Sequence, residues 1–262
     1  MKRFIIIAIT LLTTALASCT KVIHVDLNSA APKLVVEATI NDKPGPYYVV
    51  LSRTVNFDQP NQFPAATGAT VVITDATAGV TDTLTETSPG RYQTHTINGI
   101  TGHTYQMTIY ADNTTYTSSS TIPAVVPLDS MYSENFTAFG GVSKSIIPVY
   151  TDPAGVENFY RFIEVVNGKR LLNNYVRNDD RTDGLKNTRP LFNDDDDIKT
   201  GDTLVLEMQC IDKSVYTYFN SLDESSTGSG QSTPANPVNN ITGGALGYFS
   251  AYNTQSKTII VP

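Results

Sequence analysis

Seven short segments in which apolar and polar residues alternate follow one another in the first half of the chain. In order they read LVVEATI, YYVVLSR, ATVVITD, VTDTLTE, GRYQTHT, TYQMTIY and TYTSSST, separated by turn-forming stretches such as NDKPGP, SPG and NGITG. Alternation with a period of two places one side of a strand against a core, with Val71 and Ile73 expected inward. The pattern predicts an antiparallel β-sandwich over residues 33–122.

A second β-rich region is expected after the proline-bounded stretch IPAVVP, over residues 128–262. Strands are predicted at residues 145–151, 157–166, 170–177, 203–211, 245–252 and 257–261. One short helix is predicted after Asp212, which can cap its first turn. Four apolar residues then recur at helical spacing and share one face: Val215, Tyr218, Phe219 and Leu222. The chain is therefore expected to be mainly β, with two domains.

Residues 1–18 have the pattern of a bacterial secretion signal. Lys2 and Arg3 give a positive start, and the apolar run that follows is shorter than the roughly 20 residues of a spanning helix. The run ends in LASC, which resembles the lipobox of bacterial lipoproteins, in which the cysteine is acylated and becomes the first mature residue. Cys19 is therefore the predicted lipidation site, with palmitate expected among its acyl groups.

An ordinary cleavage site is the alternative interpretation of the same residues, because Ala15 and Ala17 also form an A-x-A pattern. An unmodified Cys19 would be free to pair with Cys210, whereas lipidation leaves Cys210 unpaired. Cys210 closes the alternating run LVLEMQC, which predicts a buried, inert thiol. Residues 19–32 show no period and are expected to form a tether between the lipid and the body.

The chain is acidic, with 18 Lys and Arg residues against 25 Asp and Glu residues. Loss of Lys2 and Arg3 with the signal makes the mature chain two charges more negative than the −7 of the full sequence. Such a surface disfavours nucleic acid, since basic residues that neutralise phosphates supply most of that affinity. Anionic lipid headgroups also repel it, so a membrane is expected to hold the protein through its N-terminal lipid.

Clustered carboxylates make residues 193–197 a candidate site for a hard cation such as calcium. Asp194 and Asp196 are the predicted ligands if a metal binds there, on one face of a bent loop. The run lacks the glycine and glutamate spacing of an EF-hand. A second acidic patch consists of Asp179, Asp180 and Asp183. It nearly matches the EF-hand spacing but has Arg181 at a ligand position. Solvated acidic loops are the favoured interpretation of both, and no metal or cofactor is expected.

Amide and aromatic side chains near the C-terminus form a candidate ligand site. Asn239 and Asn240 beside Tyr248 could hydrogen-bond to a sugar and stack on it, but a tight turn into a buried strand also explains them. Trp, the broadest stacking surface, is absent from the chain. No motif of serine hydrolases, zinc proteases or nucleotide-binding loops occurs, and His95 and His103 fall in separate predicted strands, so no enzyme is expected.

Several longer segments carry a family resemblance. They include LVVEATI, SPGRY, GHTYQMTI, DPAGVENFYRF, GDTLVLEMQCIDKSVYTYF and NPVNNITGGALGYFSAY, and with them nearly all of the mature chain resembles the Bacteroidota lipoproteins of the domain of unknown function 4249. The resemblance implies an outer-membrane lipoprotein with an N-terminal immunoglobulin-like or transthyretin-like sandwich, often encoded beside a TonB-dependent receptor. It implies no established activity and no catalytic residue.

A non-enzymatic envelope lipoprotein that serves an outer-membrane transporter is therefore the first functional expectation. The alternative is a glycan-binding or peptide-binding adhesive module on the same anchor. Surface-exported lipoproteins of that phylum tend to carry acidic residues directly after the lipidated cysteine, whereas six other residues precede the first acidic one, Asp26, here. The leaflet of the outer membrane that the protein occupies is left open.

Overall fold

The computed structural model describes residues 31–56, 59–60, 62–138, 141–194, 196–227 and 236–262. The predicted signal peptide, Cys19 and most of the predicted tether lie outside these residues. The described chain is mainly β with one short helix, which confirms the fold class expected from the alternation. Within the described part, no helix is both long and apolar enough to cross a membrane.

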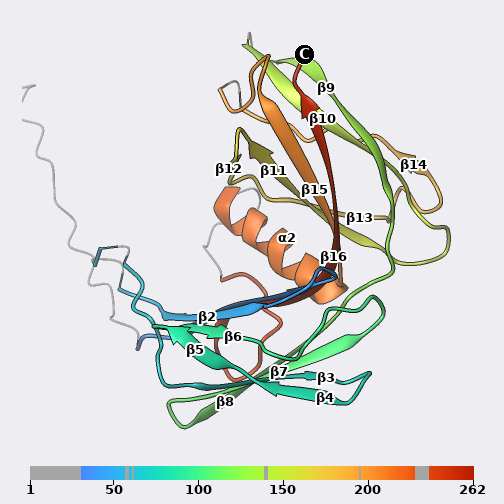
Figure 1. The fold of residues 1–262 in the computed structure, drawn as a ribbon. Coiled ribbons are helices and arrows are strands. Elements are labelled where there is room, and N and C mark those ends of the chain that lie inside the picture. Colours follow the sequence, from blue (N-terminus) through green and yellow to red (C-terminus); the bar gives the residue numbers. More distant parts are fainter. Residues whose placement is uncertain (1–30, 57–58, 61, 139–140, 195, 228–235) are drawn as a thin grey trace, which may run out of the picture.

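One long sheet and two smaller sheets build the molecule (Figure 1). The long sheet has the order β12 (Lys169–Arg170), β11 (Phe159–Val166), β15 (Thr203–Ile211), β16 (Leu246–Ile260), β1 (Leu34–Asn41), β2 (Tyr48–Arg53), β6 (Arg91–Gln93) and β5 (Thr85–Ser88), and β13 (Tyr175–Asn178) also pairs with β11. The four-stranded sheet has the order β4 (Val80–Thr83), β3 (Thr70–Asp75), β7 (Thr104–Ala111) and β8 (Thr114–Thr121). The three-stranded sheet has the order β14 (Lys186–Asn187), β10 (Gly141–Thr151) and β9 (Leu128–Ala138).

The N-terminal sandwich packs β1, β2 and β6 against the four-stranded sheet. Val71 and Ile73 are buried in its core, as the alternation predicted. The segment VTDTLTE does not form the single strand that was expected. It changes sheets at the buried Leu84, so that β4 joins the four-stranded sheet and β5 joins the long one. Only Leu84 in this segment contributes to the hydrophobic core. The residues on either side of it are therefore free to pair with different sheets.

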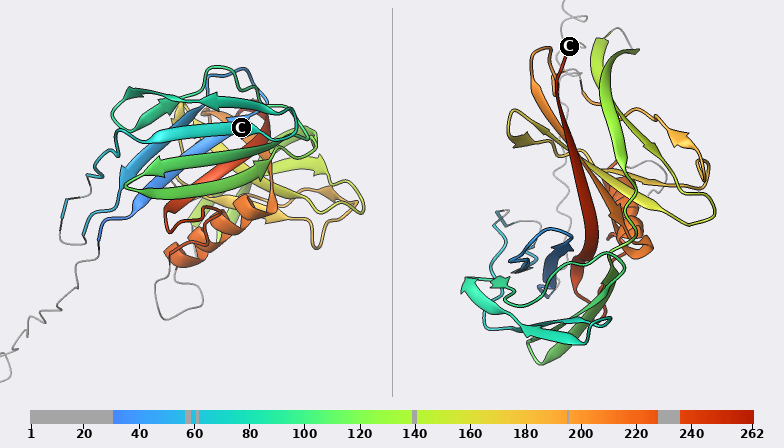
Figure 2. Two further views of the ribbon diagram at one scale, coloured as in Figure 1. Left: turned by 90° about the horizontal axis from the view of Figure 1, so that it is seen from below. Right: turned by 45° about the vertical axis from the view of Figure 1, so that its right-hand side comes forward.

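β16 is common to both halves of the molecule, as Figure 2 shows in the right-hand view. Its first part pairs with β1 in parallel, with Phe249 opposite Ala38, and its later part pairs antiparallel with β15, with Thr258 opposite Val205. Phe249 lies in the core of the N-terminal sandwich, whereas Val261, just after the strand, lies in the core between the long sheet and β9 and β10. The predicted ranges 33–122 and 128–262 therefore share one sheet.

Three strand predictions of the second region are wrong in their extent. Residues 245–252 and 257–261 form one continuous strand, because the polar residues between them bond to neighbouring elements: Thr254 donates to Glu207, and Gln255 donates to the Val126 carbonyl. The predicted strand at residues 170–177 is interrupted between β12 and β13. There the Asn174 amide leaves the sheet to donate to a carbonyl of the helix.

The helix α2 (Lys213–Thr227) begins where the sequence predicted it. Asp212 Oδ1 accepts the backbone N–H of Val215 at 3.0 Å, which is a helix N-cap. Val215 and Phe219 are buried against β11 and β15, with Tyr218 and Leu222 partly buried beside them. Asp212 Oδ2 also accepts hydrogen bonds from Ser120 and from the Thr121 backbone, so one carboxylate joins the helix to the end of β8.

The IPAVVP stretch is attached to β16 along its length. The Asn253 amide donates to the carbonyls of Pro123 and Ala124 at 2.8 and 3.3 Å, and Gln255 bonds both to the Val126 carbonyl and to the Leu128 N–H. Asn253 is fully buried. The stretch expected to be a linker thus carries hydrogen bonds that fix it against the shared strand.

We expect Asn253→Ala to lower the free energy of unfolding by about 2 kcal/mol, because it removes a fully buried amide and leaves the carbonyls of Pro123 and Ala124 without their donor. Urea unfolding followed by circular dichroism measures the change. Ser256→Ala is the matched control, since Ser256 lies exposed on the same strand and should cost less than about 0.5 kcal/mol. Equal midpoints for the two variants would contradict this role of Asn253.

Candidate functional site

Among the described residues, the predicted cation ligands Asp194 and Asp196 belong to no group of three carboxylates close enough to hold a metal ion. Asp196 is almost fully exposed and pairs with Lys199 at 3.3 Å, and the Asp194 N–H donates to Asp197. Of the described residues in the run, only Asn193 is buried, and its amide donates to the buried Glu164. The structure therefore places these acidic residues in a loop at the surface, with one anchor in the core.

The amides of Asn239 and Asn240 are occupied within the fold. Asn240 accepts the Phe249 N–H at 3.0 Å and donates to the Phe249 carbonyl at 2.7 Å, which imitates a strand neighbour for β16. Asn239 donates to the Ala245 carbonyl and accepts the Ile241 N–H. Both residues thus hold the turn that leads into β16.

Tyr248 packs its ring against the helix. Its centroid lies 5.0 Å from that of Tyr218 and 4.9 Å from that of Phe219, and the guanidinium of Arg161 stacks on Phe219 at 3.7 Å. Burial raises the pKa of Tyr248, so the phenol stays neutral. The three residues predicted for a ligand site are therefore held by contacts within the protein.

The two body histidines lie just outside strands, not within them as predicted. Asp82 accepts three backbone N–H groups from residues 95–97, which draws His95 out of β6 into a bend. The His95 ring meets the Thr85 hydroxyl at 2.9 Å, and the His103 ring meets the Asp75 carboxylate at 2.8 Å. In the described residues, neither ring bonds to both a hydroxyl and a carboxylate, which is the arrangement that a serine-type hydrolase requires.

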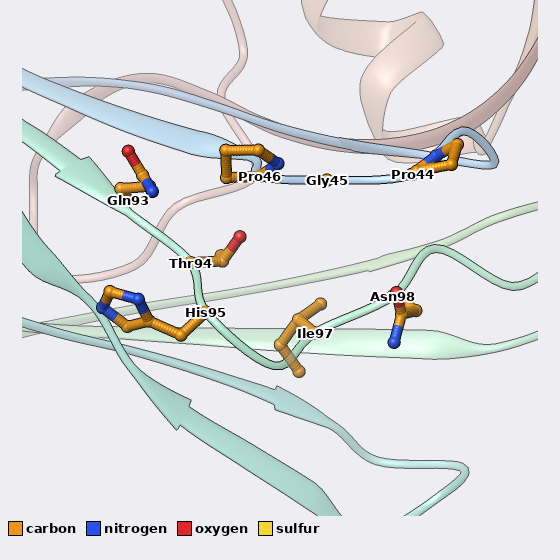
Figure 3. A pocket seen from close by; sticks show the side chains of 8 residues that line it. All are labelled: Pro44, Gly45, Pro46, Gln93, Thr94, His95, Ile97 and Asn98. Atoms are coloured by element: carbon orange, nitrogen blue, oxygen red, sulfur yellow. The ribbon is translucent and has the colours of Figure 1, made fainter.

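A hollow of about 360 Å³ lies beside His95, between residues 44–46 and residues 93–98 (Figure 3). Burial opposes ionisation of Asp82, but the three backbone N–H groups of residues 95–97 hold the pKa of that carboxyl below its usual value. Among the described residues that line the hollow, His95 is the only one with a titratable side chain. The polar groups at this hollow hold the loop of residues 95–97 in place, and their arrangement does not suggest a catalytic reaction.

Three carboxylates that the sequence keeps apart converge where strands of the second region end. Asp152 follows β10, Asp179 follows β13, and Asp183 lies in the turn before β14. One oxygen from each lies within 4.8 Å of the other two. The strand registers explain this convergence, because β11 pairs with β13 and β10 pairs with β14 through their terminal residues.

Each of these carboxylates accepts a hydrogen bond from a neighbour. The donors are the Tyr160 hydroxyl to Asp152, the Asn158 N–H to Asp179 at 2.8 Å, and the Gly155 N–H to Asp183 at 2.6 Å. Asp152 and Asp179 are buried, while Asp183 is exposed. Burial raises the pKa of Asp152, and the nearby charges of Asp179 and Asp183 raise it further. Hard oxygen donors of this kind are suited to a cation.

Comparison with known proteins agrees with the resemblance seen in the sequence. Residues 20–258 match the protein family described as Domain of unknown function (DUF4249). The chain belongs to the DUF4249 family. Among curated proteins, none matches it. The family description names no activity, so the function of this DUF4249 protein has to be argued from its own residues.

Cys210 of the DUF4249 chain is buried and has no disulfide partner within the described residues, which confirms the prediction of a buried thiol. Burial raises its pKa to about 11, so the thiol stays protonated and is a poor nucleophile. The sequence did not connect Asp152 with the acidic patch at Asp179 and Asp183, because Asp152 follows β10 whereas Asp179 follows β13. The segment DPAGVEN before β11 was the available signal, since it places an Asp directly at a strand end.

Proposed function

We propose that this DUF4249 protein is a non-enzymatic lipoprotein of the outer membrane that docks to a TonB-dependent transporter. The motif LASC supports an acyl anchor on Cys19, and the acidic body supports attachment through that lipid rather than through lipid headgroups. The anchor confines the body near the membrane, and this raises its effective concentration near a partner in the same membrane.

One patch on the body carries the docking step of the proposal. It consists of two exposed aromatic residues, Phe136 on β9 and Phe192 in the loop after β14, and we name it the aromatic patch. The rings of Phe136 and Phe192 lie 4.7 Å apart, although each is about half exposed. Exposed aromatic side chains that gather in one place are typical of protein interfaces, where they supply most of the binding energy.

The position of the aromatic patch also favours a protein partner. β9 is the edge strand of the three-stranded sheet, so its outer backbone groups are open to pairing within the described residues. The neighbouring Leu191 is fully buried and exchanges backbone hydrogen bonds with Ile146 of β10, which fixes the loop that carries Phe192. A rigid patch loses little entropy on binding.

Mild crosslinking in the native envelope, followed by purification of the lipoprotein, tests the proposal. We expect the wild-type protein to recover a TonB-dependent barrel, and the double variant Phe136→Ala/Phe192→Ala to recover at least about tenfold less, since interface anchors contribute about 2 kcal/mol each. Phe63→Ala is the matched control, because Phe63 is an exposed phenylalanine on the other sandwich. Recovery of no barrel by the wild-type protein would contradict the proposal.

The alternative of a glycan-binding or peptide-binding module gains no specific support from the described residues. The amides of Asn239 and Asn240 are bonded to the backbone, and Tyr248 packs against the helix. A glycan array probed with the lipoprotein in detergent discriminates the two functions, since a saturable glycan hit would favour the alternative.

A further inference from the structure

The carboxylates of Asp152, Asp179 and Asp183 form a cluster of like charges without a balancing side chain. Among the described residues, no Lys, Arg or His makes an ion pair with any of the three. Exposed carboxylates elsewhere do find such partners, as Asp112 does with Arg53 at 2.5 Å. Buried charges in proteins are normally paired or coordinate metals, because an unpaired charge is costly to desolvate.

Two buried oxygen atoms at this cluster accept no hydrogen bond from the described residues. Asp152 is 1% exposed, and its Oδ2 has no partner although Oδ1 accepts from Tyr160. Asn158 is 5% exposed and donates its backbone N–H to Asp179, while its side-chain Oδ1 has no partner. Most buried acceptors in proteins have a hydrogen-bond partner, so two unsatisfied oxygens beside three carboxylates favour a cation site over a solvated loop.

The spacing and chemistry of the donors fit calcium. Calcium binds oxygen at about 2.4 Å, so two ligands on opposite sides of one ion lie up to about 4.8 Å apart. The three carboxylate oxygens lie within that separation of one another. The donor set contains only carboxylate and amide oxygens, which calcium prefers to the nitrogen and sulfur that zinc selects.

Solvent reaches the cluster through a surface hollow of about 280 Å³. Gly155, Asp179 and Asp183 line it, together with Asp180. Such a space admits an ion and the water molecules that complete a coordination of six to eight oxygens. The backbone is also shaped for it, because Gly155 has a φ of +76° and directs its N–H to Asp183.

We propose that Asp152, Asp179 and Asp183 bind one calcium ion, with the Asn158 amide oxygen as a further ligand. The ion would join the end of β10, the end of β13, the start of β11 and the turn before β14. In the described structure, short strand pairs and a few hydrogen bonds, such as that from the Asn158 N–H to Asp179, join these segments at this point. Calcium therefore stabilises the second region of the protein, by mass action on the folded state.

Titration of the full-length lipoprotein in detergent tests this site, after removal of divalent cations with a chelator. We expect calorimetry with calcium chloride to show one saturable site, with a dissociation constant of about 0.1 to 1 mM, as in extracellular calcium modules. The unfolding temperature should rise with calcium concentration. Asp183→Asn keeps the acceptor for the Gly155 N–H, but should weaken calcium binding by at least about tenfold.

The unfolding temperature of Asp152→Asn, with and without calcium, distinguishes a calcium ligand from a residue that is only structural. Its amide oxygen can still accept from Tyr160, and the loss of one charge relieves repulsion with Asp179 and Asp183. In chelator we expect this variant to unfold at a higher temperature than wild type, and in about 10 mM calcium we expect the order to reverse.

Asp196→Asn is the matched control, because Asp196 belongs to the exposed acidic run and should leave calcium binding unchanged. Absence of a saturable site in the folded wild-type protein would overturn the proposal. Unweakened binding by Asp183→Asn, loss of binding in Asp196→Asn, or tighter binding of magnesium than of calcium would overturn it as well.

Discussion

Replacing Gly247 by alanine is expected to lower the free energy of unfolding by about 4 kcal/mol, near the upper end for single substitutions. Gly247 has a φ of +98°, and a Cβ added there would lie 1.9 Å from the Val36 carbonyl oxygen. Val36 is its register partner in the parallel pairing of β1 with β16. The clash is with backbone, so β1 itself must shift, and with it the attachment of the N-terminal sandwich. Urea unfolding measures the effect.

Gly244→Ala is the matched control for that experiment. Gly244 has a φ of +84°, but an added Cβ would meet nothing within 4 Å. It should therefore cost only the strain of a left-handed backbone, about 1 to 2 kcal/mol. If the two variants unfolded at the same urea concentration, the close approach of β1 and β16 would not be the reason for glycine at position 247.

Replacing Cys19 by serine is expected to move nearly all of the protein from the membrane fraction to the soluble fraction. Serine cannot form the thioether through which the lipid is attached, and the acidic body has no attraction for anionic headgroups. Each acyl chain contributes about 0.8 kcal/mol per buried methylene, so the loss of several chains removes the affinity that holds the protein. Fractionation of whole cells and immunoblotting measure the distribution.

Cys210→Ala is the control for the loss of a thiol, since Cys210 is the other cysteine of the chain. It is buried in the core of the second region, so its replacement should leave the lipid and the membrane fraction unchanged. A Cys19→Ser protein that stayed in the membrane fraction after a high-salt wash would show that something other than the lipid holds the body.

Local patterns predicted those parts of the fold in which each strand or helix is determined by its own residues. β15 occupies residues 203–211 as the alternation predicted, and α2 follows Asp212 with Val215 and Phe219 buried. Such elements depend on one repeating face against a core. The alternation could not show that β16 continues through Thr254 and Gln255, since those polar side chains bond to residues distant in the sequence.

Pairing between distant segments explains what the sequence could not predict. The parallel pairing of β1 with β16 joins the two ends of the described chain, and no local pattern encodes it. The carboxylate cluster has the same origin, because Asp152 meets Asp179 and Asp183 only through the strand registers. Prediction from acidic runs selected Asp194 and Asp196 instead, where the charges are adjacent in sequence but face solvent.

Mass spectrometry of the N-terminal peptide, from protein purified out of its native membranes, addresses the anchor on which the proposed function rests. We expect a chain that begins at Cys19 and carries a diacylglycerol group and further acyl mass on that residue. A chain that begins elsewhere, or a Cys19 without added mass, would contradict both the anchor and the proposed place of the protein beside an outer-membrane transporter.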